Sequence, residues 1–160
     1  MTTSQKIDRR LAQGGAVMAL AALGFVGYGL LFFVRNFSGS FLELGIGPNE
    51  VSSSKAQIEA FDKDLFHYIQ HIQIALSGFI MATGVAMAAL AWFGVRRGLL
   101  WAYVTAVGVP VLALAVALPA HYPYHLDTIG HLGLVYLATA IFAVGAGLAL
   151  PYFLRREPQS

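Results

Sequence analysis

The chain has 160 residues, of which 58% are hydrophobic and only 11% are charged, and it contains no cysteine. Because about a quarter of the residues in a soluble domain are charged, this composition indicates an integral membrane protein embedded in a lipid bilayer. The lack of cysteine excludes disulfides, cysteine-ligated iron–sulfur clusters and covalently attached c-type haem, and no basic patch with interleaved aromatic residues suggests nucleic-acid binding.

Four apolar stretches are long enough to cross about 30 Å of hydrocarbon as helices, which takes about 20 residues. None of them alternates apolar and polar residues as a barrel strand does. The first exceeds the 7 to 15 apolar residues of a signal peptide, so we expect it to remain in the protein. We therefore predict an all-α bundle of four antiparallel transmembrane helices, forming one membrane domain over residues 1–160. The predicted spans are 14–34, 66–94, 99–118 and 129–154, with an outer loop at 35–64.

The basic residues are distributed unequally between the two predicted membrane faces. Seven of the ten lie beside the N-terminus, the 94–99 turn or the C-terminus, and basic residues in short segments are retained on the cytoplasmic side. We therefore expect both termini in the cytoplasm of a bacterial or archaeal cell, with the protein in its cytoplasmic membrane. The seven are Lys6, Arg9, Arg10, Arg96, Arg97, Arg155 and Arg156.

The second helix is predicted to begin outside the membrane. Ser54 and Gln57 have the spacing of a capping box, and apolar residues then recur at helical spacing. We predict one unbroken helix from about Ser54 to Gly94, which would project beyond the outer face. On such a helix Asp64, His67 and His71 share one face.

The segment "HYPYHLDTIGH" holds His121, His125 and His131, with Asp127 four residues before His131. The turns "GVRRG" and "HYPYHLDT" are short, so we expect the second, third and fourth helices to be antiparallel neighbours. Their outer ends then bring all five histidines of the chain to one membrane depth. An ionisable group near a span indicates function by default, although histidine and tyrosine are also common in interfacial aromatic belts. For His125, which lies in the turn, the interfacial role is the favoured interpretation.

Three chemistries fit this histidine cluster. A transition-metal site for Cu, Fe or Zn would use His67, His71, His121 and His131, with Asp64 and Asp127 orienting the rings. A b-type haem would need only two axial imidazoles, His71 opposite His121 or His131. A quinone would need a polar end and an apolar slot, which the same cluster could supply.

We therefore expect a redox or metal-binding membrane protein, whose outer-face histidines hold haem or a metal ion for electron transfer or quinone-linked chemistry. The alternative is a non-catalytic subunit of a larger membrane complex, or a homo-oligomer, that packs through the glycines of the first span. These glycines are Gly24, Gly27 and Gly29. No Lys, Arg, Asp or Glu lies in the middle of a span, so a proton relay has no obvious residues.

Overall fold

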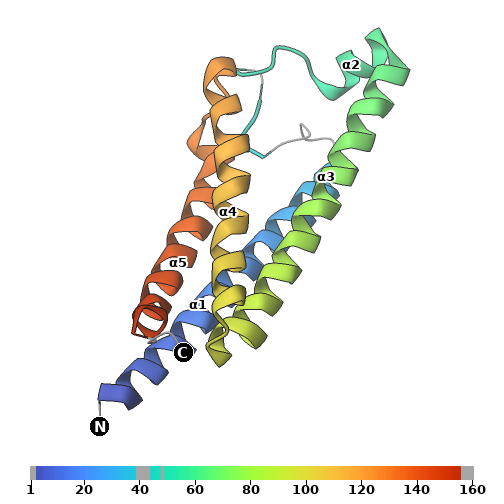
Figure 1. Cartoon of the computed structure of the whole chain (residues 1–160). Helices are drawn as coiled ribbons and strands as arrows, with labels where there is room; N and C mark the ends of the chain where they lie inside the picture. The colour runs from blue at the N-terminus through green and yellow to red at the C-terminus, as the bar shows by residue number, and fades with distance from the viewer. Residues whose placement is uncertain (1–2, 39–43, 48, 156–160) are drawn as a thin grey trace.

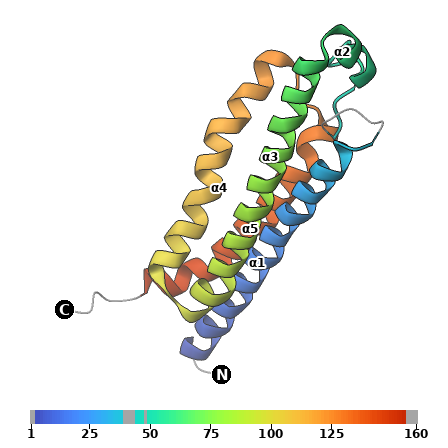
Figure 2. The same cartoon turned by 90° about the vertical axis from the view of Figure 1, so that its right-hand side faces the viewer.

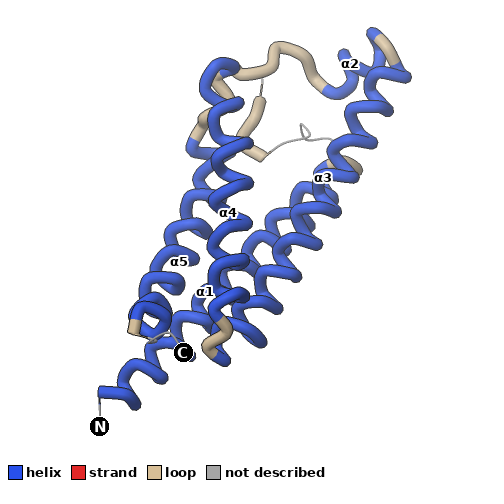
Figure 3. The backbone as a smooth tube through the Cα atoms, in the orientation of Figure 1, coloured by secondary structure: helices blue, strands red, loops and turns tan. Residues whose placement is uncertain are grey.

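The computed structural model describes residues 3–38, 44–47 and 49–155, with side chains from residue 8 onward. Over these residues the chain is helical with connecting turns, and the described part contains no strand (Figure 3). The four long elements are α1 (Thr3–Arg35), α3 (Lys63–Ala89), α4 (Leu100–His121) and α5 (Ile129–Leu154). The shorter ones are α2 (Lys55–Phe61), a π-helical turn η1 (Leu90–Gly94), and the 3-10 turns η2 (Val95–Arg97) and η3 (Tyr122–Tyr124).

Four helical segments are long and apolar enough to cross a membrane, as the sequence predicted. They are Asp8–Arg35, Lys63–Arg97, Leu100–Tyr124 and Ile129–Leu154. Both described ends of the chain and the turn η2 lie at one end of the bundle, which we call the terminal end (Figures 1 and 2). Helix α2 and the turn η3 lie at the opposite end, which we call the loop end.

Helix α1 is the centre of the bundle, because both α3 and α5 pack along it. Glycines let the backbones approach closely at these crossings. A Cβ atom at Gly14 would overlap the backbone of α5 at Gly145, and a Cβ atom at Gly84 of α3 would overlap α1 at Ala22. Gly29 of α1 likewise lies against Ser77 of α3, as predicted for a glycine at a close helix contact.

Helix α4 is the least buried of the four spans, with only Ala102 and Ala106 buried. Near the terminal end, the Tyr103 hydroxyl donates to the Ala146 carbonyl of α5 at 3.1 Å, and the Tyr103 ring stacks on Phe153 with 4.6 Å between centroids. Toward the loop end, α3 leans away from α4 and α5 (Figure 1). The short η2 turn therefore joins α3 and α4 at the terminal end without bringing their loop ends together.

The predicted unbroken helix from Ser54 to Gly94 is wrong. The capping box is present, since the Ser54 hydroxyl accepts from Gln57 N at 3.2 Å and the Gln57 side chain accepts from Ser54 N at 2.8 Å. Helix α2 nevertheless ends at Phe61, and Asp62 has an extended backbone with φ −156°. The Asp62 carboxylate accepts from the N–H groups of Asp64 and Leu65, both at 2.9 Å, so it caps a new helix instead of continuing the old one.

Candidate metal-binding site at the loop end

His131 lies in the first turn of α5 and is 5% exposed. Thr128 is the N-cap of this helix, and its hydroxyl accepts a hydrogen bond from His131 N at 3.2 Å. The cap fixes where α5 begins, and therefore which face of the helix carries the imidazole. His131 Nδ1 lies 3.0 Å from the carbonyl oxygen of Leu44 in the first loop.

The first loop is held against α5 by two glycines and a hydroxyl. Gly45 has φ +72°, a left-handed conformation that glycine adopts without strain, and it lies directly on Gly130. A Cβ atom at Gly45 would overlap the backbone of Gly130 and His131. The Thr128 hydroxyl donates to the Gly45 carbonyl at 3.0 Å. These contacts place the Leu44 carbonyl where it accepts a hydrogen bond from His131 Nδ1.

His121 is the last residue of α4 and contributes the second imidazole. Its Nδ1 lies 2.8 Å from the carbonyl oxygen of Ala117, one helical turn earlier. Its Nε2 lies 3.2 Å from Nε2 of His131, and the ring centroids are 5.1 Å apart with an interplanar angle of 33°. The two rings therefore meet through their Nε2 atoms and are not stacked face to face.

The hydrogen bonds determine where the ring protons lie. A carbonyl oxygen only accepts, so Nδ1 of both His121 and His131 must carry the donated proton. A neutral imidazole has a single N–H, which leaves both Nε2 atoms with a lone pair. The two Nε2 atoms, 3.2 Å apart, can therefore act as acceptors or as metal ligands.

The pair has the features of a metal-ligating histidine pair. A histidine that ligates a metal through one nitrogen usually donates its other N–H to a carboxylate, a backbone carbonyl or water, and both rings do this here. Two nitrogens about 2.0 to 2.1 Å from one tetrahedral ion are about 3.3 Å apart, close to the observed 3.2 Å. A haem plane between these two nitrogens would require them to separate, because the iron bonds each nitrogen on opposite sides of the ring.

The structure brings together two of the four predicted histidine ligands. His67 and His71 are exposed on α3, whose loop end stands apart from α4 and α5 (Figure 1). Asp64 and Asp127, predicted to orient the rings, are also exposed, and carbonyl groups accept from both Nδ1 atoms in their place. Across residues 3–38, 44–47 and 49–155, no three His, Cys, Asp or Glu side chains gather closely enough to hold a metal ion.

The residues that hold the pair were not predicted. They are Ala117, Leu44, Gly45 and Thr128, and the first three act through backbone atoms that carry no sequence signal. Thr128 did have a signal, because a threonine three residues before His131, at the start of an apolar run, is typical of an N-cap. His125 is exposed in the turn with φ 56°, outside the pair.

A second polar cluster at the loop end closes the carboxyl end of α1. Lys55 Nζ donates to the carbonyl groups of Asn36 at 3.0 Å and Ser38 at 2.8 Å, and lies 3.4 Å from that of Arg35. Burial and the nearby charge of Arg35 lower the pKa of Lys55 below its ordinary value. Gln70 Nε2 donates to the Asn36 carbonyl at 3.1 Å. This cluster joins α2 and α3 to the end of α1, whereas the histidine pair joins α4 to α5.

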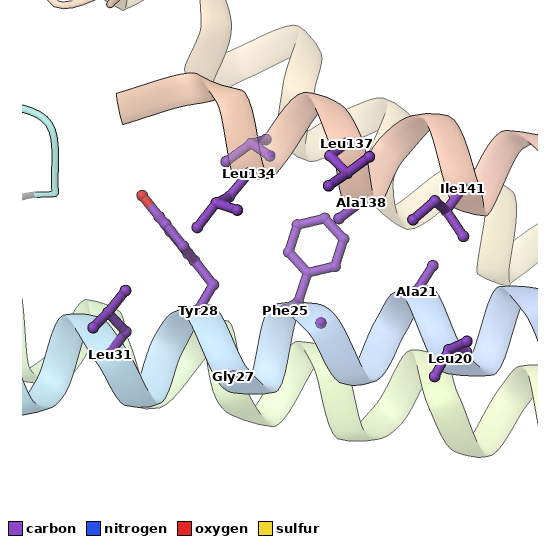
Figure 4. Close-up of a pocket in the computed structure, with 12 residues that line it drawn as sticks. Leu20, Ala21, Phe25, Gly27, Tyr28, Leu31, Leu134, Leu137, Ala138 and Ile141 are labelled. Atoms are coloured by element: carbon purple, nitrogen blue, oxygen red, sulfur yellow. The ribbon is translucent and has the colours of Figure 1, made fainter. Parts of the chain in front are cut away.

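An apolar cavity of about 330 Å³ lies between α1 and α5, with Leu134 and Val135 in its wall one turn from His131 (Figure 4). The side chains of Phe25 and Tyr28 extend from α1 toward α5 across it (Figure 4). Gly24 and Gly27 also line the cavity, and no atom lies within 4 Å of a Cβ built at either position. Unlike Gly29, these two predicted contact glycines open onto free space within the bundle.

A comparison of the chain with protein-family models, curated proteins and solved structures gives no match. The functional argument therefore depends on the geometry of the chain itself.

Proposed function

We propose that the chain is an integral membrane protein that binds one transition-metal ion between Nε2 of His121 and Nε2 of His131. The observation that supports this is the 3.2 Å separation of the two nitrogens in rings whose Nδ1 atoms are both engaged by backbone carbonyls. The two imidazoles occupy two adjacent positions of a tetrahedral ion, and the remaining positions are filled from outside the pair, by water or by a small substrate.

The donor set fits Cu, Fe or Zn, because imidazole is a good ligand for all three. Copper or iron would give the site one-electron chemistry, and zinc would give it Lewis-acid chemistry only. A site for a single ion fits the pair better than haem, since the two nitrogens already lie at the separation that one tetrahedral ion requires.

We also propose that the loop end faces the outside and that the terminal end faces the cytoplasm. Among the described side chains, the terminal end carries five arginines and one carboxylate, Asp8. The loop end carries five carboxylates and three basic residues. Reporter fusions after Arg97 and after Asp127 should give a cytoplasmic and an external signal respectively. The reverse pattern would place the histidine pair on the cytoplasmic side.

The test of metal binding is equilibrium dialysis of the purified, detergent-solubilised protein against Zn²⁺, Cu²⁺ and Fe²⁺ in turn, followed by elemental analysis. We expect about one equivalent of at least one metal in the wild type, and none in His121→Ala or His131→Ala. His125→Ala is the matched control, since it removes an exposed imidazole from the same turn, and it should bind as the wild type does. If the wild type binds no metal in stoichiometric amount, the proposal fails.

One observation favours a second candidate function, a subunit that packs into a larger complex. Gly24 and Gly27 are exposed on α1 with no atom within 4 Å of a Cβ built at either position, and small residues allow close helix approach. A partner helix seated there should still co-purify with the His121→Ala/His131→Ala double variant, and replacement of Gly27 by Leu should release it. This outcome, with no metal in the wild type, would replace the first proposal by the second.

A further inference from the structure

An apolar groove at the terminal end has a cation beside it. The groove holds about 350 Å³ and runs between the end of α3, with η1, and the start of α4. The rings of Phe93 and Trp101, which are 58% and 62% exposed, form its walls, and the small residues Ala86, Ala89 and Gly94 line it between them. The Arg97 guanidinium lies 5.9 Å from the centroid of the Phe93 ring.

The charges at the terminal end favour an anionic ligand. The Arg96 guanidinium lies 3.8 Å over the ring of Trp92. Its Nε–H is buried and donates no hydrogen bond to any group of the described chain. The other charged side chains described at the terminal end are Asp8, Arg9, Arg10 and Arg155. An anion is therefore favoured at this end, and an apolar chain is favoured in the groove. A single molecule that offers both is a phospholipid with an anionic headgroup.

We propose that this groove binds one acyl chain of an anionic glycerophospholipid and that Arg97 contacts its phosphate. The span Lys63–Arg97 ends at this arginine, so the guanidinium lies where an apolar span meets the headgroup layer. From Gly94 to Ala86 the groove follows about 12 Å of helix into the membrane, a length suited to the upper part of an acyl chain. Trp92 and Trp101 are exposed and lie near the end of one span and the start of the next, and tryptophan is enriched near the ends of membrane spans. This site is independent of the proposed metal site.

The test is native mass spectrometry of the protein released from vesicles of phosphatidylcholine that contain one tenth phosphatidylglycerol. We expect wild-type protein to retain one phosphatidylglycerol molecule. Arg97→Gln should lower that retention by about fivefold, since a basic residue at the membrane surface contributes about 1 kcal/mol. The matched control Arg9→Gln removes the same charge from the exposed surface of α1, and should change the retention less than twofold.

A second variant tests the groove itself. Ala89→Phe fills the groove without changing any charge and should also abolish retention of phosphatidylglycerol. Ala86→Leu fills it with a smaller side chain, and serves as the groove variant if Ala89→Phe has an altered unfolding temperature in phosphatidylcholine. Equal losses in Arg9→Gln and Arg97→Gln would overturn the proposal, because they indicate a general attraction to basic charge. Wild-type retention in the groove variant would overturn it as well.

Discussion

Two pairs of histidines lie toward the loop end of this protein, and their surroundings differ. His67 and His71 are four residues apart on α3, and both are exposed. His121 and His131 belong to different helices, and their Nε2 atoms are 3.2 Å apart. Each ring donates a hydrogen bond through Nδ1 to a backbone carbonyl. Spacing of four residues on one helix places two imidazoles on one face, but it supplies neither burial nor carbonyl partners. In the pair formed between helices, His131 is buried, His121 is half-buried, and both rings have a carbonyl partner.

The largest difference between the pairs is expected for His131→Ala. This change removes one of the two ligands, leaves the Leu44 carbonyl without its donor, and creates a space in the first turn of α5. We expect metal binding to be lost and the free energy of unfolding to fall by about 2 kcal/mol, the usual cost of a buried polar group without a partner. Dialysis and denaturant unfolding in detergent measure both effects. A variant that unfolds as the wild type does would show that the Leu44 contact contributes nothing to stability.

Gly45→Ala tests how the first loop holds the pair without altering either imidazole. The new Cβ would overlap the backbone of Gly130 and His131, and alanine at φ +72° costs about 1 to 2 kcal/mol. The loop must shift and take the Leu44 carbonyl away from His131. We expect metal affinity to fall by about 10- to 100-fold, as for the loss of other groups that orient a ligand. Gly47→Ala is the control, because a Cβ there has only a distant contact with Glu50.

Thr128→Val is expected to have a smaller effect. Valine keeps the shape of threonine but removes the hydroxyl that caps α5 and donates to the Gly45 carbonyl. We expect a loss of about 1 kcal/mol in unfolding free energy, typical of a lost N-cap, and about tenfold weaker metal binding. Thr128→Ser keeps the hydroxyl and should behave nearly as the wild type. A loss in the serine variant with none in the valine variant would assign the effect to the methyl group.

The smallest effect is expected for the double variant His67→Ala/His71→Ala. Both side chains are exposed on α3, so the unfolding free energy should change by less than about 0.5 kcal/mol. Metal stoichiometry, measured by the same dialysis, should stay at the wild-type value. A loss of metal in this variant would mean that α3 approaches α4 and α5 in the metal-bound protein, and would restore the larger site predicted from the sequence.

The sequence predicted the number and the type of the membrane-spanning segments, because hydrocarbon thickness sets their length and composition. The fourth predicted span, 129–154, coincides with α5, and the capping box at Ser54 was also predicted correctly. The continuation of that helix through Asp62 was not. Apolar residues recur at helical spacing on both sides of Asp62. This periodicity does not reveal that the Asp62 carboxylate caps a new helix and so ends the previous one.

What the sequence by itself determined is therefore the set of membrane-spanning segments, since each span is decided by its own residues against a uniform hydrocarbon solvent. Which helices pack against each other was decided only by the tertiary structure. Short turns suggested that α3 and α4 pack together. Instead, Gly14, Gly84 and Gly145 let α3 and α5 approach α1 closely, and α4 does not pack along α1 in the same way. The loop end of α3 consequently leans away, and His121 meets His131 while His71 stays exposed. Backbone carbonyls complete the pair, and the residue type at Leu44 or Ala117 does not predict where its carbonyl lies.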